Sequence, residues 1–72
     1  MRNYKKRLAH HLRKLRGDTG QIAFAKRLGI SQTTLHRLEM EEQDPRLSSL
    51  EQICFRLHCE IGDLFPPLEQ DE

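Results

Sequence analysis

Polar side chains between residues 32 and 37 have the chemistry needed to recognise base edges in DNA. They are Gln32, Thr33, His36 and Arg37. In a helix their spacing places them on one face, opposite Leu35 and Leu38. Glutamine can pair through two hydrogen bonds with adenine, arginine can do so with guanine, and threonine offers a hydroxyl or a methyl group. Any solvated helix carries polar residues too, so the interpretation depends on the elements that position this face.

The segment 21–40 is typical of two short helices joined by a tight turn. Ala25 is small enough to let the helices cross closely, and Gly29 can take a positive φ where the first helix ends. Ser31 is suited to cap the second helix, and Leu35 closes a small core between the two. The spacing favours a helix-turn-helix, and with it DNA binding over a merely solvated face.

Residues that match the sequence pattern of a known helix-turn-helix family occur in a fixed order from about residue 8 to residue 65. They are 12–16, Gln21, 24–32, Leu38, Glu39, Pro45, Leu47, Leu50, Glu51, Ile53, Leu57 and 62–65. On these residues the chain resembles a single-domain member of the phage-repressor and Cro-like (XRE) helix-turn-helix family. The resemblance implies an all-α fold, a compact bundle of four to five short helices similar to the DNA-binding domain of lambda repressor. We expect this domain to span residues 1–68.

The resemblance also implies which residues contact DNA. The family's base-contacting positions fall on Gln32, Thr33 and Arg37, with Thr34 and His36 at the margin of the groove. The family's glutamine at the start of the first motif helix touches a phosphate and braces the next helix. For this chain the resemblance therefore implies a phosphate contact by Gln21 and a contact between Gln21 and Gln32.

The loop after the second motif helix differs from the family pattern. Its expected DNA contacts are Gln43 and Arg46, but the loop is crowded by acidic residues, namely Glu39, Glu41, Glu42 and Asp44. Glu41 stands where a glycine often ends the helix, and a non-glycine residue in the left-handed region costs about 1 to 2 kcal/mol. Arg16 and Glu39 match positions that pair beneath the recognition helix in the family, so we expect an ion pair between them.

Charge is divided unevenly along the 72 residues, although the formal net charge is only +1. Residues 1–38 hold ten Lys and Arg against the single acid Asp18, a net charge of +9, and residues 39–72 carry −8. A basic half suits a phosphate backbone, because neutralising phosphates releases counterions. The acidic half should face away from DNA or meet another partner.

Local signals predict the bounds of the remaining helices. A first helix should run from an Asn3 cap to Arg16, with Leu8, Leu12 and Leu15 as its buried stripe. Thr19 is expected to cap the next helix in place of Gly20, because a Ser or Thr stands at that position in relatives.

The C-terminal half is expected to hold one further helix and a last turn. The sequence 48–51 reads as a capping box that starts the helix, which buries Leu50, Ile53, Cys54 and Leu57. A last turn at 61–65 is followed by two prolines, and 69–72 should form an acidic mobile tail.

Enzymatic chemistry and metal binding are not predicted. The sequence holds neither a catalytic Ser-His-Asp or Cys-His grouping nor a glycine-rich phosphate loop, so we expect no catalytic residue and no cofactor. Cys54, His58 and Cys59 raise the possibility of zinc, but a structural zinc site needs four ligands at a recognisable spacing. The apolar pattern already accounts for Cys54 as a core residue.

The chain is expected to be cytoplasmic. Nothing in these residues resembles a signal peptide, and no apolar run approaches the roughly 20 residues that cross a bilayer. Cys54 and Cys59 fit that compartment as reduced thiols. If both lay on one helix, they would be about 7.5 Å apart along its axis, too far for an unstrained disulfide.

Two functions of different classes follow from these observations. The first is a transcriptional regulator, a repressor or autoregulator, that binds double-stranded DNA as a homodimer and reads a palindromic operator with helix 32–40. The second is a protein-interaction module of the same fold, for example an antitoxin, whose acidic half binds a protein partner. Phe55, Ile61 and Phe65 are the candidate homodimer or docking surface, and the alternative for these three residues is a partly covered edge of the core.

Overall fold

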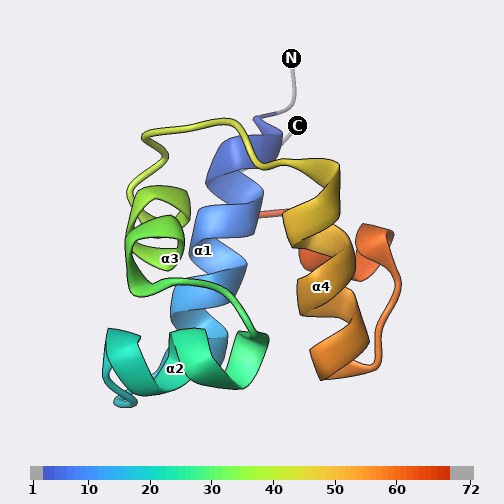
Figure 1. Ribbon diagram of the computed structural model, residues 1–72. Coiled ribbons are helices and arrows are strands. Elements are labelled where there is room, and N and C mark those ends of the chain that lie inside the picture. Colours follow the sequence, from blue (N-terminus) through green and yellow to red (C-terminus); the bar gives the residue numbers. More distant parts are fainter. Residues whose placement is uncertain (1–2, 69–72) are drawn as a thin grey trace.

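The computed structural model describes residues 3–68, which form four α-helices and one short 3₁₀ helix (Figure 1). In chain order these are α1 (Tyr4–Arg16), α2 (Gln21–Leu28), α3 (Gln32–Glu39), α4 (Leu47–Leu57) and η1 (Ile61–Leu64). Within this range the chain contains no strand, which confirms the predicted all-α bundle. The expected tail at 69–72 lies outside the described residues.

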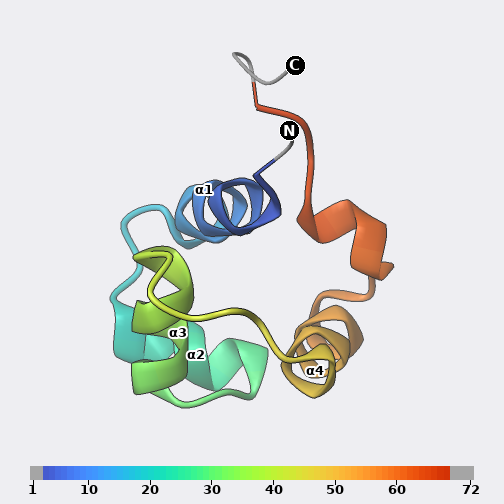
Figure 2. The same ribbon diagram turned by 90° about the horizontal axis from the view of Figure 1, so that it is seen from above.

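The helices enclose one apolar core. Viewed from above, α1, the α2–α3 pair, α4 and η1 surround a common centre (Figure 2). α1 packs against α3 and η1, and α2 packs against α3 and α4. The core residues are Leu8, Leu12, Phe24, Ala25, Leu28, Leu35, Leu38, Leu50, Ile53, Cys54 and Leu64. All four α-helices contribute to this core, so the position of α3 is fixed from several sides.

α1 begins as predicted and buries two of the three residues of its predicted stripe, Leu8 and Leu12. The side chain of Asn3 accepts a hydrogen bond from the backbone N–H of Lys6 at 3.0 Å, which caps the helix. Leu15, however, is 42% exposed, so its predicted burial is wrong. The buried stripe continues from Leu8 and Leu12 to the next position four residues on, Arg16, whose side chain meets α3.

The turn between α2 and α3 forms as the sequence predicts. Gly29 adopts a left-handed conformation with φ of 75°, and the N–H of Ile30 donates to the carbonyl of Ala25 at 3.0 Å. A Cβ at Gly29 would meet Nε2 of Gln52 on α4, but the Gln52 side chain can move aside, so the positive φ is the main reason for glycine here. Ser31 caps α3 by accepting from the N–H of Thr34 at 3.0 Å.

Two predicted helix starts are wrong. Gly20, rather than Thr19, is the N-cap of α2, and no side chain caps this helix. α4 starts at Leu47 with Arg46 as its N-cap, so Ser48 lies inside the helix and does not cap it. The hydrogen bond from the N–H of Leu50 to the carbonyl of Arg46, 3.0 Å long, already belongs to the first turn.

Candidate nucleic-acid interface

The outer face of α3 borders an open hollow with a volume of about 480 Å³. The lining residues are Gln21, Gln32, Thr33, His36, Arg37 and Glu42, and we refer to this region as the α3 hollow. The predicted set of Gln32, Thr33, His36 and Arg37 is exposed, whereas Leu35 and Leu38 on the opposite stripe are buried. The amphipathic pattern of residues 32–39 therefore presents its polar side chains to solvent together.

A buried network beneath α3 fixes its orientation. The carboxylate of Glu39 is 1% exposed and forms two hydrogen bonds with Arg16, from Nε to Oε2 at 2.8 Å and from Nη2 to Oε1 at 2.9 Å. These hydrogen bonds, together with the charge of Glu39, raise the pKa of Arg16 above its ordinary value. The expected ion pair is thus present, and it ties the end of α1 to the end of α3.

Gln21 belongs to this network as well as to the hollow. Its Nε2 donates to Oε1 of Glu39 at 3.1 Å, in place of the contact with Gln32 that the family resemblance implied. Gln21 is the first residue of α2, and Gly20 before it provides no side-chain cap. The first backbone N–H groups of α2 are therefore available at the rim of the hollow, where an anion would be favoured.

The other expected DNA contacts lie outside the hollow. Thr34 is half-buried, and its hydroxyl accepts from the hydroxyl of Ser31 at 2.8 Å, so it takes part in the cap of α3. Gln43 is half-buried and Arg46 is exposed, but neither lines the α3 hollow. The structure therefore brings together Gln21, Gln32, Thr33, His36 and Arg37, and separates them from Thr34, Gln43 and Arg46.

The loop after α3 turns back toward the hollow. Glu41 has a φ of 60°, so a non-glycine residue does occupy the left-handed position. The N–H of Glu42 then donates to the carbonyl of Arg37 at 2.9 Å, as in a Schellman ending. Sequence reasoning missed Glu42 as a residue of this site. The signal for it was Glu41, which stands where a glycine often ends the helix. A Schellman ending places the residue after the left-handed one beside the last turn of the helix.

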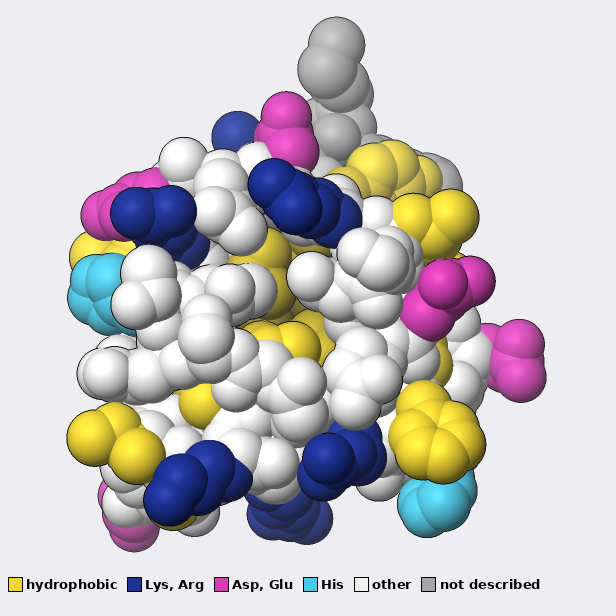
Figure 3. All heavy atoms as spheres, in the orientation of Figure 1, with side chains coloured by type: hydrophobic (Ala, Val, Ile, Leu, Met, Phe, Trp, Pro, Cys, Tyr) yellow, Lys and Arg dark blue, Asp and Glu magenta, His cyan; other side chains and the backbone are white. Residues whose placement is uncertain are grey.

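Charged side chains of both signs surround this face of the bundle. Figure 3 shows Lys and Arg side chains along the lower and upper edges, and Asp and Glu side chains at the right edge, the top and the left of the molecule. The acidic loop is partly neutralised, because Asp44 pairs with Lys5 of α1 at 3.5 Å. The exposed pair is worth at most about 1 kcal/mol, but it leaves the loop with one free carboxylate fewer.

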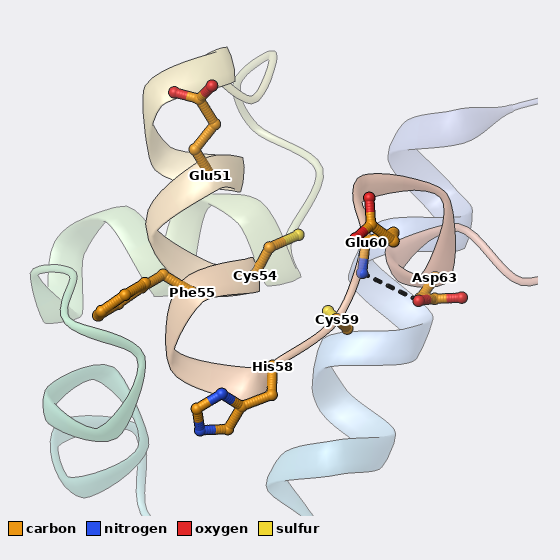
Figure 4. Close-up of a pocket in the computed structure, with 7 residues that line it drawn as sticks. All are labelled: Glu51, Cys54, Phe55, His58, Cys59, Glu60 and Asp63. Atoms are coloured by element: carbon orange, nitrogen blue, oxygen red, sulfur yellow. Dashed lines mark hydrogen bonds between the residues drawn. The ribbon is translucent and has the colours of Figure 1, made fainter.

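A second hollow, of about 440 Å³, separates α4 from η1 (Figure 4). Its lining residues are Glu51, Cys54, Phe55, His58, Cys59, Glu60 and Asp63. Both cysteines are free, and burial raises the pKa of the Cys54 thiol to about 11, with a further contribution from its hydrogen bond to Cys59. Cys59 follows the end of α4 and packs against the core, so the two cysteines do not share a helix. Among residues 3–68 no group of His, Cys, Asp or Glu side chains is arranged to hold a metal ion.

The predicted apolar surface on the C-terminal half is not continuous. Phe55 is 73% exposed and its ring points away from η1 in Figure 4. Ile61 and Phe65, in contrast, pack against the core, and the ring of Phe65 meets that of Tyr4 edge to face at 5.8 Å. The backbone carbonyl of Phe65 also accepts from the buried Arg7 at 3.5 Å. The packing of Ile61 and Phe65 favours the alternative that they form a partly covered edge of the monomer core, while Phe55 is the exposed residue of the candidate surface.

Comparison with known proteins agrees with this geometry. The family model of the Cro/C1-type helix-turn-helix DNA-binding domain matches residues 11–67, and this chain belongs to that family. The fold is similar to the crystal structure of a hypothetical transcription factor, NHTF, from Neisseria, with a TM-score of 0.76 and 21% identity over 94% of this chain and 80% of that one. No curated protein sequence matches the chain. None of the helices within residues 3–68 is long and apolar enough to cross a membrane.

Proposed function

We propose that the chain is a sequence-specific transcriptional regulator that reads base edges in the major groove with α3. The observation that carries this proposal is the accessibility of three side chains in the α3 hollow, Gln32, Thr33 and Arg37. All three are exposed, and within residues 3–68 no hydrogen bond or ion pair engages them. The buried Arg16–Glu39 pair holds the backbone of the helix that carries them, so the three side chains leave the protein from one fixed face.

Each side chain has a separate task in this proposal. Arg37 has the length and the paired donors to bind guanine, and Gln32 can bind adenine through its amide. Thr33 offers a hydroxyl or methyl contact, with His36 and Thr34 at the margin of the groove. Gln21 and the uncapped N-terminus of α2 meet a phosphate, and Gln43 and Arg46 contribute further backbone contacts.

The regulator acts as a homodimer on a palindromic operator. Two-fold symmetric readers of this kind place their recognition helices about one turn of DNA apart. Phe55 on α4 is the largest exposed apolar side chain on the acidic half and is the residue we assign to the dimer contact. A small domain that occupies an operator excludes other proteins from that DNA, so the simplest outcome is repression, including repression of its own gene.

Selection of bound sites from random duplexes tests the proposal. The full chain should enrich a palindrome, and the Arg37→Ala variant should lose the preference at one symmetric pair of positions. If the chain enriches no sequence and instead captures a protein through its acidic half, the regulator proposal is wrong. The fold would then serve a protein-interaction module, such as an antitoxin, whose exposed Phe55 and adjacent carboxylates meet the partner.

A further inference from the structure

Glu42 places a carboxylate among the side chains proposed to read DNA. It lines the α3 hollow together with Arg37, His36 and Gln32. Its position is fixed by backbone contacts, because its N–H donates to the carbonyl of Arg37 at 2.9 Å after the left-handed residue Glu41. Its side chain is exposed, and within residues 3–68 no hydrogen bond or ion pair engages the carboxylate.

The neighbouring acids differ from Glu42 in this respect. Asp44 is paired with Lys5, and Glu39 is buried between Arg16 and Gln21. Glu41 is half-buried and does not line the hollow. A free carboxylate on a DNA-facing surface is repelled by the phosphates, so its presence weakens binding to DNA in general. It favours a particular site only if that site supplies a hydrogen-bond donor.

Only some base edges in the major groove carry a hydrogen-bond donor that the carboxylate of Glu42 could meet. An ionised carboxylate can only accept hydrogen bonds. Guanine and thymine present acceptors, and the amino group of adenine lies beside the acceptor N7, which would face the second carboxylate oxygen. The N4 amino group of cytosine is the donor that Glu and Asp side chains recognise in this groove.

We infer that Glu42 is a specificity-determining residue that accepts a hydrogen bond from the N4 amino group of a cytosine in the operator. Arg37 and Glu42 are joined through the backbone, so one donor and one acceptor are presented to the DNA as a unit. The operator should then contain a cytosine at a fixed distance from the guanine read by Arg37. The inference rests on the proposed function and adds one requirement, namely a cytosine at a defined position in the operator.

Site selection with matched variants tests this inference. Glu42→Ala and Glu41→Ala each remove one carboxylate from adjacent positions in the same loop, and circular dichroism checks that both remain folded. The wild-type chain should enrich a cytosine at one symmetric pair of positions, and Glu42→Ala should lose that discrimination by at least about fivefold. The other base preferences should persist, and Glu41→Ala should leave the cytosine preference intact.

Two other outcomes overturn the inference in different ways. If Glu42→Ala strengthens binding to the operator and to random duplexes by the same factor, with every base preference unchanged, then Glu42 acts only by repelling phosphates. The proposed function would survive that result, because the wild-type chain would still select a sequence. If the wild-type chain selects no sequence at all, the proposed function and this inference fail together.

Discussion

The guanidinium of Arg16 and the carboxylate of Glu39 form a two-pronged pair at 2.8 and 2.9 Å, and the carboxylate is almost fully buried. The side chain of Arg16 is only 24% exposed, so this pair differs from an ordinary surface ion pair. Its two members lie at the C-terminal ends of α1 and α3. The pair therefore links the long helix of the bundle to the helix that carries the proposed reading residues.

Removal of Arg16 alone should be more harmful than removal of the pair. Arg16→Met leaves the buried carboxylate of Glu39 with only Gln21 as a partner, and we expect the Tm to fall by at least about 10 °C. The double variant Arg16→Met, Glu39→Met removes both charges and should be more stable than Arg16→Met. Thermal unfolding followed by circular dichroism measures both. An unchanged Tm in Arg16→Met would mean that the pair contributes nothing to stability.

Relief of backbone strain at Glu41 should stabilise the fold. Glu41 adopts a φ of 60°, which is unfavourable for any residue with a Cβ. Glu41→Gly should raise the free energy of unfolding by about 0.5 to 1 kcal/mol, after allowance for the greater freedom of glycine in the unfolded chain. Glu41→Ala keeps the strain while removing the same side chain, so it should not be stabilised. Urea unfolding of the two variants separates strain from charge, and equal stability would contradict this explanation.

Protonation of His11 should destabilise the folded state. The half-buried ring has a pKa below the ordinary 6.5, first because of desolvation and then because of the charges of Lys14 and His10, against which Asp63 acts weakly. The unfolded chain therefore binds a proton at a higher pH than the folded chain does. The contribution of His11 to the free energy of unfolding is therefore fully present above pH 6.5 and decreases as the pH falls below 6.5.

The measurement is the urea midpoint between pH 7.5 and 5, compared with that of His11→Gln. The variant should lose less stability over this interval than the wild-type chain. His36→Gln, which changes an exposed histidine of α3, is the matched control and should follow the wild-type curve. If His11→Gln and the wild-type chain show the same slope with pH, His11 does not contribute to the acid sensitivity.

The sequence predicts this fold well where the determining signals are local. Asn3, Gly29 and Ser31 each act through hydrogen bonds or dihedral angles within a few residues, and each has its predicted role. The spacing of Leu8, Leu12 and Leu15 predicts burial of Leu15 because helical spacing alone allows several stripes, and only the neighbouring helices determine which one is buried. Arg46 was missed as a helix start because it caps α4 without a side-chain hydrogen bond.

The candidate site was predicted only in part for a similar reason. The exposed face of α3 follows from the spacing of Gln32, Thr33 and Arg37 against buried leucines. The position of Glu42 depends on the direction in which the loop leaves α3, and that direction is set by the left-handed conformation of Glu41. The inward position of Phe65 depends on Tyr4, which is distant in sequence. Contacts of this kind cannot be read from local patterns.

Dimerisation through Phe55 should respond to salt in the opposite direction to DNA binding. The acidic residues near Phe55 repel their counterparts in a second copy, so added salt screens the repulsion and strengthens the dimer. The same salt weakens DNA binding by reducing counterion release. Sedimentation at low and high salt measures the first effect.

Phe55→Lys should be monomeric, whereas Ile22→Lys, an equivalent change at another exposed apolar residue, should still dimerise. A Phe55→Lys variant that dimerises normally would exclude this contact.

Base reading by Arg37 and phosphate anchoring by Arg46 should have different consequences. The side chain of Arg37 lies in the α3 hollow and makes no hydrogen bond or ion pair with residues 3–68, whereas Arg46 is exposed outside the hollow. Arg37→Ala should lose about 1 to 3 kcal/mol of binding free energy at the operator and relax the preference at one symmetric base position. Arg46→Ala should weaken binding to all duplexes similarly and reduce the slope of log affinity against log salt concentration by about one unit.

Fluorescence anisotropy with operator and random duplexes at several salt concentrations distinguishes base reading from phosphate anchoring. If Arg37→Ala lowers both affinities equally, α3 does not read bases through this residue, and Arg37 contacts the backbone as Arg46 does.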